Sequence, residues 1–408
     1  MKTDLWALAI VSLSVFFCPA RGNAQDVLGG LPSLPSGFSE VPSTATPVSS
    51  PSRPGDQSFD ASFGLSILSD SNVRQGNDRG GFPVESDLII SPTLSLNYLR
   101  TRSLWQLGGR AQVTRQLFQK SSDFNATNYS LGMFGGYQST KLVTSFTSDL
   151  SSISGVNRLS GVFIEQFSYA TGALARYHLS GKTSFLASWN QQNTESQSAG
   201  FGDISSTTLG ASALWRATPL ISLGPGLRYG IRSGDNRTGD FTVVGPTLRL
   251  DYDLASRVKL RSSLGYDFSE SPATDDRTLV NWSLALDYSP SDLWGLGVTM
   301  VRDTQATFIT GGGFDQTSSY GLTYRRKVRK AQVAFNLSYQ VRDPQDSLRA
   351  VNGIRDSNFL SYGASLALPV FGDKANLSTN LTWREQTSQD DNFSWEGLQL
   401  GANLRWNF

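Results

Sequence analysis

The sequence has few of the residues on which thiol, imidazole or metal chemistry depends. Cysteine and histidine each occur once in 408 residues, and methionine occurs three times. The cysteine, Cys18, lies in an N-terminal segment that we expect to be removed, so the mature chain should have no disulfide, free thiol or lipid anchor. A hydrolase of the Ser/His type would depend on His178 alone, which lies beside a predicted short turn.

Long hydrophobic runs are also missing. No stretch after the N-terminus approaches the roughly 18 consecutive apolar residues that a membrane helix needs, and the mean hydropathy is slightly negative. Yet the chain holds nine Trp, thirteen Tyr and 23 Phe. A net charge of +1 argues against an electrostatic nucleic-acid binder, so no nucleic-acid partner is expected.

The N-terminus resembles a secretory signal peptide. Lys2 precedes an apolar run from Leu5 to Phe17, and small residues end at Ala24, which predicts a signal peptide over 1-24. Residues 25-56 are rich in Pro, Ser and Gly and have little to bury, which indicates a periplasmic leader rather than a plug domain.

From residue 57 to 408 the chain alternates apolar and polar residues. In the last segment, Leu398 to Phe408, every second residue is apolar, as in a strand with one face in an apolar medium and the other in water. The pattern recurs in segments near 58-69, 87-98, 103-118, 128-137, 141-150, 165-178, 182-190, 205-216, 220-232, 242-253, 257-268, 278-288, 293-302, 316-326, 330-342, 358-370, 374-384 and 397-408. The sequence therefore predicts an all-β, transmembrane, antiparallel up-and-down β-barrel of about 18 strands, with 16 as the alternative.

The connections and the aromatic residues support this topology. Long connections such as 70-86, 151-164 and 191-204 alternate with short ones such as 99-102 and Ser180-Gly181. Barrels of the outer membrane have long outer loops and short periplasmic turns, so both termini should be periplasmic. Tyr and Trp residues gather at both ends of the predicted strands, as in interface girdles.

The opposite parity of each strand predicts the barrel interior. The residues expected to line it are Arg110, Gln112, Arg176, Arg228, Arg249, Asp251, Arg261, Asp267, Asp287, Arg325, Asn336, Asn380 and Arg405. Such a polar wall would let hydrated solutes pass, and its excess of arginine predicts a mild preference for anions. The alternative is a filled lumen in which these groups satisfy one another.

Other polar clusters point to no cofactor or metal. Asp275-Asp276 and Asp390-Asp391 fall in predicted outer loops and do not have the ligand spacing of a calcium loop. Gly311-Gly312-Gly313 is not followed by the Lys-Ser/Thr and helix of a phosphate-binding loop. We expect no catalytic, cofactor-binding or metal-binding residues.

One region resembles a known family. Ser69-Asp70-Ser71-Asn72-Val73, followed by the segment from Ser86 to Leu96, resembles outer-membrane β-barrel porins often encoded beside exopolysaccharide synthesis and export genes. The resemblance implies a porin with a part in polysaccharide export, and export components as partners. The terminal strand, with Trp406 and Phe408, resembles the signal read by the barrel insertion machinery, which would be a transient partner.

These observations predict a channel for hydrophilic solutes in the outer membrane, in contact with its lipid and lipopolysaccharide, with polysaccharide translocation as the more specific hypothesis. One alternative is a structural or adhesive barrel that acts through its outer loops, and another is an outer-membrane hydrolase. The choice between a monomer and a trimer stays open.

Overall fold

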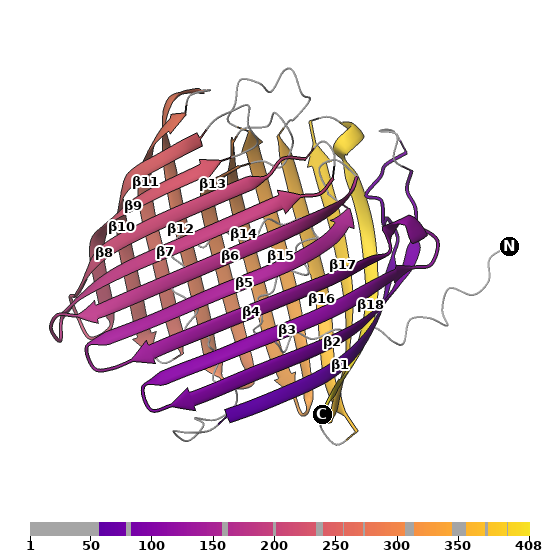
Figure 1. The fold of residues 1–408 in the computed structure, drawn as a ribbon, viewed down its shortest axis with the longest axis horizontal. Helices are drawn as coiled ribbons and strands as arrows, with labels where there is room; N and C mark the ends of the chain where they lie inside the picture. The colour runs from indigo at the N-terminus through magenta and orange to yellow at the C-terminus, as the bar shows by residue number, and fades with distance from the viewer. Residues whose placement is uncertain are drawn as a thin grey trace.

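A computed structural model describes residues 57–78, 83–156, 162–198, 201–233, 240–255, 257–271, 274–306, 314–344, 356–371, 374–389 and 391–408. The expected signal peptide, the leader and Cys18 lie outside these residues. The described chain forms one closed sheet of 18 strands (Figure 1). The predicted fold class is therefore confirmed, with 18 strands rather than 16.

Consecutive strands are neighbours around the whole wall. The strands are β1 (Gln57–Asp70), β2 (Asp87–Arg102), β3 (Trp105–Phe118), β4 (Ala126–Gln138), β5 (Leu142–Val156), β6 (Phe163–His178), β7 (Thr183–Ser196), β8 (Ile204–Arg216), β9 (Ile221–Ser233), β10 (Asp240–Ala255), β11 (Val258–Ser271), β12 (Thr274–Ser291), β13 (Trp294–Ala306), β14 (Phe314–Val328), β15 (Ala331–Pro344), β16 (Ser357–Val370), β17 (Ala375–Ser388) and β18 (Trp395–Asn407). Two short 3-10 helices, η1 (Ser122–Phe124) and η2 (Asp391–Phe393), lie in the connections β3–β4 and β17–β18.

The barrel closes where its first and last strands pair. Ser62 to Asp70 of β1 are antiparallel to β18, from Asn407 back to Gln399, and the other edge of β1 pairs with β2. Figure 1 shows β1 beginning and the chain ending at the same rim of the barrel. Closure pairs the edge of β1 with that of β18 from Ser62 to Asp70, and pairing of the sheet edges is the condition for a sheet to cross a membrane.

The outer face of the wall is apolar. On β1, Phe59, Phe63, Leu65 and Ile67 are exposed, whereas the alternate residues include the buried Ser62. Exposed Leu, Val, Phe and Tyr side chains recur at the same parity on strands around the barrel. Because soluble monomers rarely expose continuous apolar patches, this face is suited to lipid.

Aromatic pairs lie near the strand ends, as the sequence predicted. At the rim of the short turns, Trp105 packs on Tyr137 with ring centroids 5.0 Å apart, and Tyr288 packs on Trp294 at 5.3 Å. Nearer the long connections, Tyr320 stacks on Tyr339 at 6.2 Å. Aromatic side chains at these levels suit the two interfaces of a bilayer.

The strands are longer than predicted on the side of the long connections. β11 runs to Ser271 and β12 starts at Thr274, so Asp275 and Asp276 lie in a strand and not in an outer loop. This extension could not be predicted from the alternation, because both faces of the sheet are polar beyond the apolar belt and the alternation disappears there. No helix in the described part of the chain is long and apolar enough to cross a membrane.

The wall turns sharply at β9 and β10. β9 carries Gly224 and Pro225, and β10 carries Gly245 and Pro246. A Cβ on Gly224 would lie 1.7 Å from the Ala213 carbonyl oxygen, and one on Gly245 would lie 2.1 Å from that of Tyr266. Only glycine permits backbones to approach so closely. The turn is tight enough to bring parts of β9 and β13, four strands apart, into contact.

The two faces of one strand give a test of this register. Leu337 on β15 is exposed on the outer face, and its neighbour Asn336 is exposed toward the interior. We expect Leu337→Arg to lower the free energy of unfolding by about 2 to 4 kcal/mol, the cost of an arginine near the bilayer midplane, and Asn336→Arg to change it little. Urea titrations of both variants in lipid vesicles measure the difference, and equal losses would contradict the assigned faces.

Candidate functional site

The candidate site is the interior surface of the barrel. The strand register places all of the predicted lining residues on the face opposite to the exposed apolar side chains; they are Arg110, Gln112, Arg176, Arg228, Arg249, Asp251, Arg261, Asp267, Asp287, Arg325, Asn336, Asn380 and Arg405. The parity of each strand was thus sufficient to assign the face of each residue. It did not show which of these charges meet.

The sharp turn of the wall brings together a cluster of four charged residues, which we call the corner cluster: Arg228, Arg232, Asp267 and Asp303. Arg228 Nη2 lies 2.7 Å from Asp303 Oδ1 and 3.1 Å from Asp267 Oδ2, and Arg232 Nη2 lies 3.3 Å from Asp303 Oδ2. Asn281 donates a hydrogen bond from its side-chain amide to Asp267. These side chains come from β9, β11, β12 and β13, so the cluster bridges strands that are not neighbours.

The corner cluster is almost completely shielded from solvent. Arg228 is 6% exposed, and Asp267 is 1% exposed. Two arginines and two aspartates give the cluster no formal net charge. Because a buried charge is tolerated only when it is paired, each member depends on the others. The cluster therefore holds the inside of the turn together rather than presenting free charge to the lumen.

Further ion pairs are spread around the interior. Arg110 Nη2 lies 2.5 Å from Asp149 Oδ1, and Arg249 Nε lies 3.0 Å from Asp251 Oδ1. Close to the long connections, Arg342 pairs with Asp315, and Arg384 Nη2 lies 2.8 Å from Asp70 Oδ2. Three of the seven arginines that the sequence assigned to the lumen, Arg110, Arg228 and Arg249, therefore have a carboxylate partner.

The sequence reading missed several of these carboxylates. Asp303 and Asp315 fell in a predicted connection, and Asp70 lay just beyond the first predicted strand, so none was given a face. Asp149 lay within a predicted strand but was not assigned to the interior. Continuing the alternation by one residue at the strand ends would have placed Asp70, Asp303 and Asp315, and applying it within the predicted strand 141-150 would have placed Asp149.

Residues 71–78, at the start of the first long connection, fold back over the mouth of the barrel at the rim of the long connections. Val73 packs in a buried hydrophobic cluster with Ile89, Phe118, Phe124 and Val156. The amide of Asn72 donates to the Glu396 carbonyl oxygen at 2.8 Å, and that of Asn77 donates to the Ser394 carbonyl oxygen at 2.6 Å. This segment, 71–78, therefore narrows the mouth on the side where β18 meets β1.

One side chain of the segment, Arg74, also holds it against the start of β2 and η1. Arg74 pairs with Glu85 and lies over the ring of Phe124, with its guanidinium carbon 4.6 Å from the ring centroid. Glu85 precedes β2, and Phe124 ends η1. The hydrophobic cluster and these polar contacts together hold the segment against the wall.

The single histidine of the chain lies at the rim of short turns. His178 ends β6, and its backbone amide donates to the Lys141 carbonyl oxygen at 2.7 Å in the rim of short turns. In the described ranges, no three His, Cys, Asp or Glu side chains come together as a metal site would require. What the interior offers is a wall of amides, hydroxyls and paired charges.

Comparisons with known proteins give only distant structural similarity. No family model matches the chain, and no curated protein matches it. Among solved structures, the chain is similar to Pseudomonas aeruginosa OpdK with vanillate at a TM-score of 0.45 and 10% identity, covering 86% of this chain and 99% of that one. Acinetobacter baumannii OccAB3 gives 0.44 and 9%, with coverages of 86% and 99%. The siderophore receptor PirA of Pseudomonas aeruginosa gives 0.43 and 8%, with coverages of 88% and 81%.

The corner cluster predicts a strong effect of one isosteric change. Asp303→Asn leaves Arg228 and Arg232 buried without their shared carboxylate, so we expect the free energy of unfolding to fall by about 3 to 5 kcal/mol. The control is Asp60→Asn, because Asp60 is an interior carboxylate that is exposed and its loss should have little effect. Denaturant titrations followed by tryptophan fluorescence measure both, and an Asp303→Asn variant as stable as the control would contradict the role given to the cluster.

Proposed function

We propose that the protein is an outer-membrane channel through which hydrophilic solutes pass passively. The observation that carries the proposal is the inversion of polarity: apolar side chains cover the outside of a closed barrel, and polar and charged side chains cover the inside. Barrels of 16 to 18 strands are wide enough to leave an aqueous lumen, whereas barrels of eight strands are filled by their side chains.

The ion pairs reduce the anion preference expected from the sequence. Arg228 and Arg249 are buried and paired, so they contribute little net charge to the lumen. Arg325 differs, because it is exposed on the interior face and its cross-strand neighbours, Gly295 and Ala334, are uncharged. We therefore assign the remaining anion preference to Arg325, near the rim of short turns.

Single-channel recording of the purified protein in planar bilayers tests both statements. We expect discrete conductance steps and a small reversal potential that favours anions and fades at high salt as the charges are screened. Arg325→Gln should reduce the reversal potential. A chain that inserts without conducting would overturn the proposal and favour a structural or adhesive barrel acting through its outer connections. A clear cation preference would overturn the assignment to Arg325.

The more specific proposal is translocation of a polysaccharide. It rests on the resemblance at Ser69 to Val73 and Ser86 to Leu96, and it would make export components partners of the barrel. The interior suits saccharides chemically, because exposed amides such as Asn336 and the guanidinium of Arg325 donate hydrogen bonds to hydroxyls and carboxylates.

Oligosaccharides of graded length provide the test of this narrower role. In the bilayer recordings, we expect neutral oligosaccharides to interrupt the current in long blockades, and acidic ones of equal length to give longer blockades in the wild type than in Arg325→Gln. If sugars reduce conductance no more than an inert polymer of the same size, the channel is a general one and the saccharide proposal fails.

We also propose that β18 carries the signal for membrane insertion. Trp406 packs against Phe371 with ring centroids 5.6 Å apart, and Phe408 is exposed at the rim, with its backbone amide bonded to the Ala61 carbonyl oxygen at 2.9 Å. The terminal aromatic residues are therefore accessible at the end of the strand that closes the barrel. The N-terminal signal peptide would deliver the chain to the machinery that inserts barrels into the outer membrane.

A further inference from the structure

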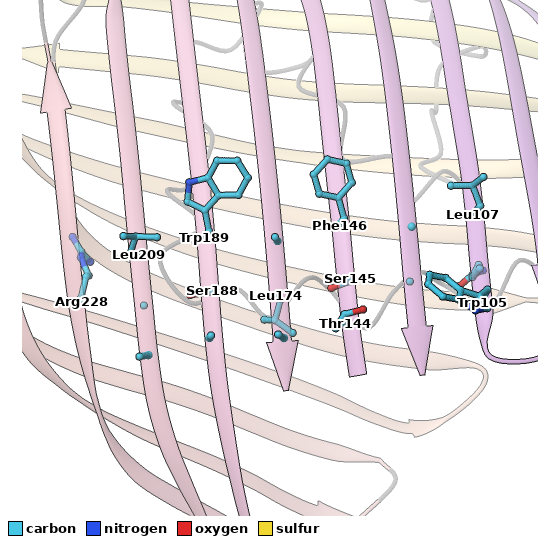
Figure 2. Close-up of a pocket in the computed structure, with 18 of the residues that line it drawn as sticks. Trp105, Leu107, Thr144, Ser145, Phe146, Leu174, Ser188, Trp189, Leu209 and Arg228 are labelled. Carbon is cyan, nitrogen blue, oxygen red and sulfur yellow. The ribbon is translucent and has the colours of Figure 1, made fainter. Parts of the chain in front are cut away.

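The outer face of the barrel is not uniformly convex. A groove of about 1220 Å³ crosses strands β2 to β10, and Figure 2 shows Trp105, Leu107, Phe146, Trp189 and Leu209 along it. The register places these five side chains on the face away from the lumen. The groove therefore faces the lipid rather than the solute path.

The shape of the groove follows from one row of small residues. Thr144, Ala175, Ala187 and Ala211 are successive cross-strand partners on β5 to β8, and all four line the groove. Bulky side chains, Phe146, Trp189 and Leu209, border this row on the side of the long connections, and Leu227 ends it on β9. A floor of small residues beside these bulky side chains leaves a furrow in the outer face. Because a row of partners climbs a tilted wall, the furrow rises from the start of β3 to the middle of β9.

Two arginines lie at the low end of the furrow. Arg100 and Arg102 line the groove on the outward parity of β2, are exposed, and make no side-chain ion pair or hydrogen bond with any residue that the structure describes. Arg102 is the cross-strand partner of Trp105, which stacks on Tyr137 at the level of an interface girdle. Two arginines without a partner among the described residues, at the level of the lipid headgroups, favour binding of an anion there.

We propose that this furrow is a binding site for an anionic glycerophospholipid from the leaflet on the side of the short turns. Its phosphate would lie against Arg100 and Arg102, and an acyl chain would fill the furrow over Ala175, Ala187 and Ala211. A second copy of the chain would cover the apolar furrow but leave the two cations without a counter-charge unless it brought an acidic group to the same rim. The inference rests on the proposed membrane placement and is independent of solute passage.

Lipid retention by the purified full-length barrel tests the site. Native mass spectrometry in a mild detergent compares binding of phosphatidylglycerol, which is anionic, with that of phosphatidylcholine, which is zwitterionic. We expect the wild type to prefer phosphatidylglycerol, and Arg100→Gln/Arg102→Gln to lose about 25-fold of that preference, because each interfacial arginine favours an anionic lipid by roughly fivefold. Arg326→Gln is the matched control, because Arg326 is an exposed outward arginine beside Trp294, away from the furrow.

A second pair of variants tests the acyl-chain site. Ala211→Phe should block the furrow and weaken binding of both lipids, whereas Ala402→Phe, on the outward face of β18, should not. Equal effects of Arg100→Gln/Arg102→Gln and Arg326→Gln, or unchanged binding in Ala211→Phe, would overturn the site. An oligomer that Ala211→Phe converts to monomers would show that a second copy occupies the furrow instead. Conductance measured on the same samples separates these outcomes from a failure of the channel proposal.

Discussion

Closure of the sheet is the constraint on which the rest of the structure depends. A strand in hydrocarbon cannot leave its backbone amides and carbonyls unpaired, so the first and last strands must meet. The pairing of Ser62 to Asp70 with β18 satisfies this condition. Once the wall is closed, every side chain points either to lipid or to the interior. The alternation of outward and inward side chains along each strand, with a period of two residues, then decides the chemistry of both surfaces.

The interior shows how a polar surface can be kept inside a curved wall without much net charge. Gly224 and Gly245 permit the turn that brings β9 toward β13, and the approach makes it possible for Arg228 to contact Asp303. The turn and the corner cluster depend on each other. The turn brings the buried ions to their partners and shields them from water, and the ion pairs hold the inside of the turn together. Net lumen charge is therefore set by the few exposed groups, such as Arg325, rather than by a count of arginines.

The fold could be predicted from the sequence because lipid and water select residues on alternate positions over the whole height of the apolar belt. Beyond that belt both faces of the sheet contact water, so apolar and polar residues no longer alternate. The predicted strands are therefore too short on the side of the long connections. Asp303 and Asp315 were lost from the predicted site for this reason. The pairings across the corner cluster could not be predicted for a second reason, because parity fixes the face of a residue but not the curvature of the wall. The contact between Arg232 on β9 and Asp303 on β13 depends on that curvature.

The large apolar residues of the lipid face do not by themselves reveal its shape. Leu107 and Trp105 mark the outward parity of β3, but the shape of the furrow is decided by alanines on β6 to β8, which the alternation treats as weak members of the same face. A row of small residues across several strands becomes visible only when the register is known, since its members are far apart in the sequence. Concave sites on the outside of a barrel are thus properties of cross-strand rows, whereas the two faces themselves are properties of single strands.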